Sequence, residues 1–211
     1  MIIVMLRNPL EMLPSYHAQM LYTVVEDVDD FEVAWNLQKS RKQGRSIPKG
    51  CIDSELLQYE RWGRLGENVA RVLEIFRRPQ VRIIFFEDFI RDTRSCYIDV
   101  LSFLGVDDDN RFEFPAVNER KEHKSRVLGY LLNNRGFIAR ISWLRDGLEK
   151  MGVDATGLKE YIKQLNARKT ARTPLSTEFS EKLVSTFRSD IKKLEVMTRK
   201  DLSHWCPDPE K

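Results

Sequence analysis

The sequence has few of the features that mark secreted or membrane proteins. It contains only three cysteines in 211 residues, Cys51, Cys96 and Cys206, which lie far apart with no Cys-x-x-Cys pair. An odd, scattered set favours free thiols in a reducing compartment and gives no metal-ligand spacing. The apolar run at residues 1–6 is too short to cross a bilayer or to serve as a signal peptide. We therefore expect a cytoplasmic protein with no membrane span and no metal.

Neither positive nor negative charge dominates the chain. There are 35 Lys and Arg against 32 Asp and Glu, and the net charge of +3 is too small to indicate nucleic-acid binding. Residues 1–116 hold 15 basic and 19 acidic side chains, whereas residues 117–211 hold 20 and 13. A solvated helical surface is the commoner cause of such a skew, and a bound anion is the functional alternative. Hydrophobic residues make up 42% of the chain, enough for the core of a single domain over residues 1–211.

The chain opens with a predicted strand that leads directly into a helix. Residues 2–6 are apolar on both faces, as in a parallel strand covered by helices on each side. A helix is expected to follow over residues 9–25. Asn8 is a capping residue, Pro9 suits the first helical position, and Glu11 completes a capping box.

The rest of the chain is predicted to be mostly helical. Pro14 predicts a kink or a restart in the first helix, because an interior proline removes a backbone donor. A second apolar strand is expected at residues 81–86, parallel to the first after a long crossover. Two strands alone cannot bury both faces of a sheet, so we expect further strands, N-terminal to Met1, to be absent from this sequence. The other expected helices are at residues 31–42, 54–76 with a break near Gly63 and Gly66, one ending at Gly105, 125–134, 137–149, 157–168 and 176–199.

Arg7 and Ser15 are the first candidate binding residues. Ligands of open α/β sheets bind at the carboxyl ends of strands, where helix N-termini supply amides and a positive dipole. Arg7 would offer a phosphate a forked donor there, and Ser15 would add a hydroxyl two turns into the helix. On the residues alone, an arginine after a strand more often forms a surface ion pair or contacts a carbonyl.

These residues resemble a known family. The strand ending in Arg7-Asn8-Pro9, with Ser15 eight residues after the arginine, is similar to the 3′-phosphate-binding element of sulfotransferases that use 3′-phosphoadenosine 5′-phosphosulfate (PAPS). The similarity runs over nearly the whole chain. The other matching stretches are residues 31–41, Phe86-Glu87-Asp88-Phe89, Phe103-Leu104-Gly105, and residues 117–125 and 201–205, the last two as in bacterial members.

The resemblance implies an α/β fold of the P-loop kinase-like type, with three layers around a parallel sheet that is N-terminally incomplete here and mostly helical. It implies transfer of a sulfuryl group from PAPS to a hydroxyl or amine of a small-molecule or carbohydrate acceptor, without a metal. By position, Arg7 and Ser15 would bind the 3′-phosphate, and Arg120 and Lys121 would meet the nucleotide from a basic loop at residues 118–124. The alternative for that loop is a solvated surface.

The sequence also departs from the family pattern. It contains no counterpart of the family's phosphosulfate loop, Pro-Lys-Ser/Ala-Gly-Thr, and the family's catalytic base also lies before the strand matched here. No base is therefore assigned. A catalytically inactive sulfotransferase-like module that binds a nucleotide or a partner is the alternative function. A kinase is opposed by the absence of a Gly-x-x-x-x-Gly-Lys-Ser/Thr loop.

The histidines and one acidic pair are the remaining candidates. His17 follows Ser15 on the first helix, where packing is a commoner role than catalysis. His123 and His204 have no carboxylate partner at a recognisable spacing, so they indicate neither a triad nor a metal site. Glu87 and Asp88 are adjacent rather than facing, which favours capping of the next turn over shared acid–base work.

Overall fold

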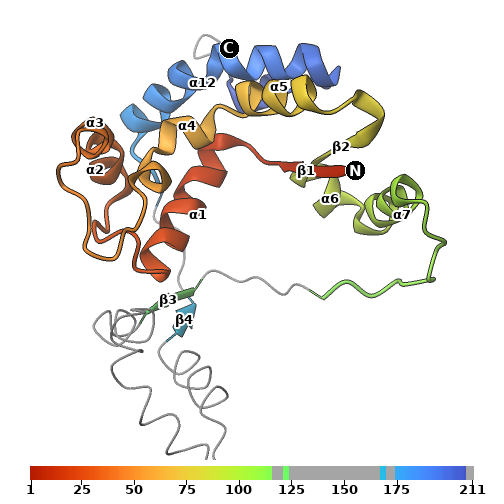
Figure 1. Cartoon of the computed structure of the whole chain (residues 1–211), viewed down its shortest axis with the longest axis horizontal. Coiled ribbons are helices and arrows are strands. Elements are labelled where there is room, and N and C mark those ends of the chain that lie inside the picture. Colours follow the sequence, from red (N-terminus) through yellow and green to blue (C-terminus); the bar gives the residue numbers. More distant parts are fainter. Residues whose placement is uncertain (116–120, 124–166, 170–173, 208–211) are drawn as a thin grey trace, which may run out of the picture. The chain divides into compact units, whose positions relative to one another are not determined.

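The computed structural model describes residues 1–115, 121–123, 167–169 and 174–207. Its contacts divide the chain into two compact units, and Figure 1 labels the α-helices and strands of both. Each unit combines separate stretches of the sequence, so the division does not cut the chain into two consecutive domains. The single domain expected over residues 1–211 stays a prediction. Among the described helices, none is long and apolar enough to cross a membrane. The first unit is built from Met1–Leu13, Glu60–Val117 and Leu175–Lys211, and the second from Pro14–Tyr59 and Asn118–Pro174.

The first unit contains a parallel strand pair. β1 (Ile2–Leu6) pairs with β2 (Val81–Phe85) in a register that sets Ile2 opposite Val81 and Leu6 opposite Phe85. Both predicted strands and their parallel pairing are confirmed. The expectation that β1 is covered on both faces is wrong for the described residues, because Ile3 and Met5 are 43% and 50% exposed.

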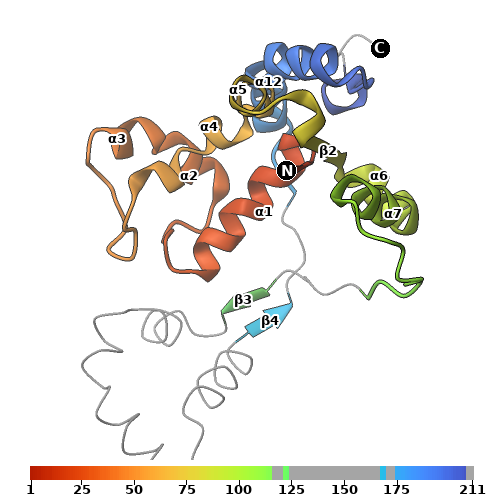
Figure 2. The same ribbon diagram turned by 45° about the vertical axis from the view of Figure 1, so that its right-hand side comes forward.

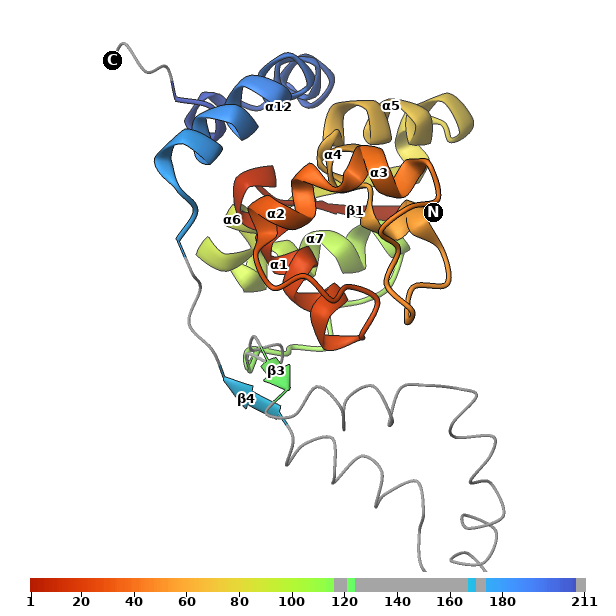
Figure 3. The same ribbon diagram turned by 90° about the vertical axis from the view of Figure 1, so that its left-hand side faces the viewer.

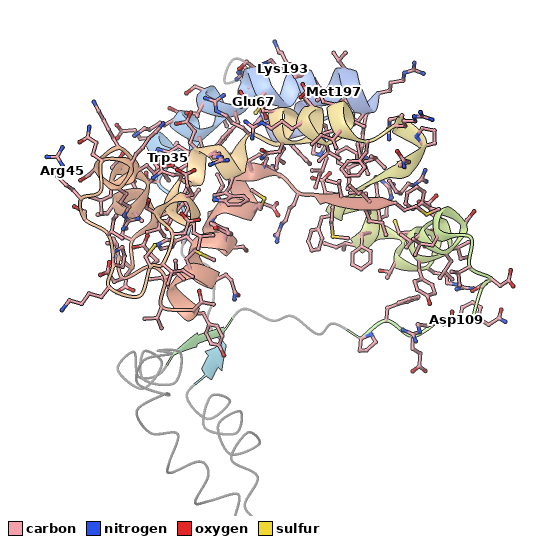
Figure 4. The ribbon with its side chains drawn as sticks, viewed as in Figure 1. Trp35, Arg45, Glu67, Asp109, Lys193 and Met197 are labelled. Carbon is pink, nitrogen blue, oxygen red and sulfur yellow. The ribbon has the colours of Figure 1, made fainter. Side chains whose placement is uncertain are left out.

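Helices α5 (Leu65–Ile75) and α12 (Thr177–Thr198) pack together in the same unit. The buried carboxylate of Asp190 on α12 accepts hydrogen bonds from the amides of Gly66 and Glu67, at 2.7 and 2.9 Å, and so caps the N-terminus of α5. A Cβ at Gly66 would lie 2.4 Å from the Asp190 carbonyl oxygen, so the close approach requires glycine. Figure 4 labels Glu67 on α5 and Lys193 on α12.

Two further helices follow β2 in this unit. α6 (Phe86–Arg91) starts as soon as β2 ends, and α7 (Thr93–Leu104) follows it with Asp92 as its N-cap. The two helices lie side by side in Figure 2. Gly105 ends α7 with φ +71°, in the left-handed conformation, which confirms the predicted C-cap. The unit also contains the short 3-10 helices η2 (Arg78–Gln80) and η3 (Ser203–Trp205).

The second unit is held by a buried ion pair. Glu26 and Arg41 have fully buried side chains, joined by two hydrogen bonds of 2.6 and 2.7 Å. The Tyr59 hydroxyl donates to Glu26 at 2.5 Å, and the amides of Asp27 and Val28 also bond to its carboxylate. Burial would raise the pKa of Glu26, but the hydrogen bonds from Arg41 and Tyr59 outweigh it and hold the pKa below its ordinary value.

Two of the predicted helices are divided into shorter ones in the structure. Asp30 caps a helix as expected, yet the helix over 31–42 divides into α2 (Phe31–Asn36) and α3 (Gln38–Lys42), seen in Figure 3. The helix over 54–76 divides into η1 (Ser54–Leu57), α4 (Tyr59–Gly63) and α5, and the break between α4 and α5 confirms the one predicted near Gly63 and Gly66. Gly63 marks one break, where a Cβ would lie 2.4 Å from the Phe187 ring.

Three other expectations need correction. α1 (Pro9–Tyr22) continues through Pro14 without a restart, because burial of Leu13 and Pro14 favours the continuous helix over the lost hydrogen bond, while the alternative of a kink at Pro14 stays a prediction. The basic loop contains the short strand β3 (Lys121–His123), which pairs antiparallel with β4 (Ala167–Lys169). β4 occupies the last positions of the helix expected over 157–168, since backbone groups at 167–169 pair across strands instead. The helix over 176–199 is confirmed as α12.

Replacing Arg41 by leucine should cost about 3–5 kcal/mol of unfolding free energy, because the Glu26 carboxylate is left buried without its cation. Urea denaturation at neutral pH measures the loss. Arg64→Leu is the matched control, since Arg64 pairs with Glu60 at the surface and should cost less than about 1 kcal/mol. Equal losses in the two variants would contradict the structural role of the buried pair.

The Glu26 pair should also make stability depend on pH under acidic conditions. Glu26 titrates near its ordinary pKa of 4.5 in the unfolded chain and lower in the folded chain. Its contribution is therefore complete above about pH 4.5 and is lost as the pH falls through the lower folded pKa. Denaturation at a series of pH values should show that the free energy of unfolding falls more steeply with acid in the natural chain than in Glu26→Gln. Parallel curves would exclude Glu26 as the group responsible.

Candidate functional site

The candidate site lies at the carboxyl end of the parallel strand pair. Arg7 is the first residue after β1 and Phe86 the first after β2, and the register of the strands brings the two side by side. The guanidinium carbon of Arg7 lies 4.7 Å from the centroid of the Phe86 ring. A cation over an aromatic face is attracted by the negative charge of that face, so Phe86 forms a platform for Arg7.

Glu11 is the second partner of Arg7. Its Oε2 accepts from both Nη2 and Nε of Arg7, at 2.8 and 3.1 Å. The two side chains are 30% and 50% exposed, so this ion pair is open to solvent and weak. The predicted capping box takes a different form, because Asn8 Oδ1 accepts from the Leu10 amide at 3.0 Å while the Glu11 carboxylate turns to Arg7.

Ser15 lies on α1 and is exposed, as a binding hydroxyl requires. Arg7 belongs to the first unit and Ser15 to the second. Joint contact of the two with one phosphate therefore stays a prediction. The neighbouring Tyr16 donates its hydroxyl to the Leu56 carbonyl at 2.9 Å. Burial, with smaller contributions from Cys51 and Asp53, raises the pKa of Tyr16 to about 12, so this hydroxyl stays protonated at neutral pH.

The basic residues predicted to cover the nucleotide are described only in part. Lys121 is the first residue of β3, and Arg120 and Lys124 lie outside the described residues. Contact of Arg120 and Lys121 with a nucleotide stays a prediction. Among the described residues, no group of three or more His, Cys, Asp and Glu side chains is placed to hold a metal ion.

His17 is a packing residue. It is only 3% exposed, its Nε2 lies 2.8 Å from the Val28 carbonyl oxygen, and its ring lies 5.3 Å from the ring of Phe31. A base must reach a proton of the substrate, and a buried imidazole bonded to the backbone cannot do so. The packing role favoured by the sequence is therefore supported for His17.

The structure adds one carboxylate cluster that the sequence did not reveal. Glu87 accepts a 2.5 Å hydrogen bond from the Trp205 indole nitrogen and lies 2.8 Å from Nε2 of His204. Lys200 pairs with the next residue, Asp88, at 2.5 Å. The expectation that Glu87 and Asp88 serve only as caps is too narrow, and His204 does have a carboxylate partner. More than a hundred residues separate these partners, so no local spacing could signal the contacts.

Comparisons with known proteins bear on this geometry. A family model described as a sulfotransferase domain matches residues 1–127, which is more than half of the chain and includes β1, α1 and β2. A search of curated proteins gave no match.

Among solved structures, the crystal structure of a sulfotransferase from Alicyclobacillus acidocaldarius resembles this chain with a TM-score of 0.57 and 21% identity. The alignment covers 96% of this chain but only 56% of that protein. At this identity the likeness shows the fold alone, and it supports the expected α/β class. The family match carries the assignment further: this chain belongs to the sulfotransferase family.

Proposed function

We propose that this chain binds the 3′-phosphate of PAPS and acts in sulfuryl transfer from that donor. The single observation that supports this function most is the place of Arg7. It stands on the Phe86 platform at the carboxyl end of a parallel strand pair and directly before the N-terminus of α1. Fixed cations and helix-terminal amides at such an edge favour phosphate.

The chemistry asks the protein mainly to position charge. A hydroxyl or amine of the small-molecule or carbohydrate acceptor attacks the sulfur of PAPS and forms the new bond to it. The bond from sulfur to the phosphate oxygen breaks, 3′-phosphoadenosine 5′-phosphate (PAP) leaves, and the acceptor's proton passes to a base. Holding the 3′-phosphate fixes the far end of the donor, so binding energy orients the reacting sulfur. Arg7 and Ser15 are the proposed ligands of that phosphate, with Arg120 and Lys121 closing over the nucleotide.

Arg7→Ala should weaken PAP binding about 10- to 100-fold, because a forked, charge-assisted contact with a phosphate is lost. Isothermal titration with PAP and with adenosine 5′-monophosphate, which lacks the 3′-phosphate, measures the effect. Only the PAP affinity should fall steeply. Arg7→Lys should recover part of it, because charge without the fork is kept. Ser15→Ala should cost less than Arg7→Ala, since one neutral hydrogen bond is removed.

Arg91→Ala is the control, since Arg91 is 78% exposed and pairs with Asp88 on α6. Unchanged PAP affinity in Arg7→Ala would reject the assigned site. Release of PAP from PAPS in the presence of candidate acceptors then separates the two functions considered. PAP binding without any transfer would favour the inactive nucleotide-binding module.

Glu11→Gln should strengthen PAP binding about two- to fivefold. In the free protein the Glu11 carboxylate forms an ion pair with Arg7. Its negative charge would also repel a phosphate dianion bound to Arg7, through the solvent that surrounds both groups. The gain should shrink as salt is added, because the repulsion is screened. Titrations at low and high ionic strength test both effects. A weaker affinity in Glu11→Gln would show instead that Glu11 orients Arg7 for the ligand.

A further inference from the structure

The end of the described chain folds back onto the edge of the sheet that carries Arg7. Helix α12 stops at Arg199, which adopts the left-handed conformation with φ +55°. The Leu202 amide then donates to the Glu195 carboxylate of α12 at 2.7 Å and fixes the reversal. The 3-10 helix η3 follows. We call residues 199–206 the C-terminal clasp.

The clasp holds the turn between β2 and α6 at successive residues. Trp205 is fully buried, donates to Glu87, and places its ring 6.0 Å from the ring of Phe85. Lys200 pairs with Asp88 and lies 4.8 Å from the centroid of Phe85. His204 adds a second contact to Glu87 at 2.8 Å. The clasp therefore touches the residue before Phe86 and the two residues after it.

Phe86 is the residue between these contacts, and it is the platform on which Arg7 rests. An arginine at the surface loses affinity for an anion if its long side chain must be ordered on binding. A platform that is itself fixed on both sides reduces that ordering cost. The chain of contacts runs without a gap from Trp205 through Glu87 and Phe86 to Arg7.

We propose that the C-terminal clasp sets the specificity of the Arg7 site for nucleotides that carry a 3′-phosphate. Trp205 and Lys200 act as positioning residues: they touch no ligand, and they fix the turn that supports Arg7. This inference rests on the proposed function, in which Arg7 binds the 3′-phosphate. The clasp is far from Arg7 in the sequence, so its contribution depends on the folded contacts alone.

The test compares PAP with adenosine 5′-monophosphate in Trp205→Phe and Lys200→Met. Trp205→Phe keeps an aromatic ring and removes the indole N–H, and Lys200→Met keeps the aliphatic stem and removes the charge. Each should weaken PAP binding about 5- to 20-fold while the affinity for adenosine 5′-monophosphate changes less than about twofold. Arg91→Ala is the matched control, because it also removes a cation from Asp88 but belongs to α6, not to the clasp.

A merely stabilising clasp gives a different result. It would lower the affinity for both nucleotides equally, through a smaller folded fraction, or would leave both unchanged, and either outcome overturns the proposal. If Trp205→Phe fails to fold, Glu87→Gln and Glu87→Leu replace it. The glutamine keeps an acceptor for the indole N–H and should retain most of the preference for PAP, whereas the leucine should lose it.

A second readout needs no nucleotide. The Nε–H resonance of Arg7, assigned by its disappearance in Arg7→Lys, should shift in Trp205→Phe and stay in place in Arg91→Ala. A resonance that stays in place in Trp205→Phe overturns the positioning role. If the natural chain binds PAP no better than adenosine 5′-monophosphate, the 3′-phosphate function fails first, and the specificity role of the clasp falls with it.

Discussion

The register of two short parallel strands is the constraint on which the candidate site depends. Leu6 stands opposite Phe85, so the next residues along each strand, Arg7 and Phe86, come together at one edge. Side chains alternate between the faces of a strand, and a slip of one residue would turn Arg7 away from the ring. The site is thus a property of pairing between distant segments, and the short motif around Arg7 is only half of it.

Each unit also places a carboxylate in its interior and satisfies it in its own way. Asp190 receives two backbone amides at the start of α5, so a side chain of α12 completes a helix that lacks a cap of its own. Glu26 receives a guanidinium, a phenol and two amides. Such carboxylates can stay buried because all of these hydrogen bonds are made, and the loss of one would lower the stability of the fold. These networks fix which helices can approach one another.

Local chemistry in the sequence predicted much of the fold. Apolar runs located both strands, Asp30 and Gly105 were identified as helix caps, and the strand–Arg–Asn–Pro pattern placed Arg7 where the structure has it. The break near Gly63 was also predicted, but the break at Leu37 was not. The contact that requires glycine at position 63, with the ring of Phe187 far away in sequence, could not be predicted either. The same holds for Glu26 with Arg41 and for Glu87 with Trp205. Periodicity reports which face is apolar, and it does not report which buried polar groups will meet.

The reversal of the chain at Arg199 has a consequence for the order in which the molecule can form. Asp190 meets an amide 124 residues earlier, and Trp205 meets a carboxylate 118 residues earlier. Contacts of such sequence separation close large loops, and they form late because their entropy cost precedes their stabilisation. During synthesis β1 leaves the ribosome long before α12 and η3 exist. The edge of the sheet that carries Arg7 therefore lacks its contacts with residues 199–206 until α12 and η3 have been synthesised and have folded.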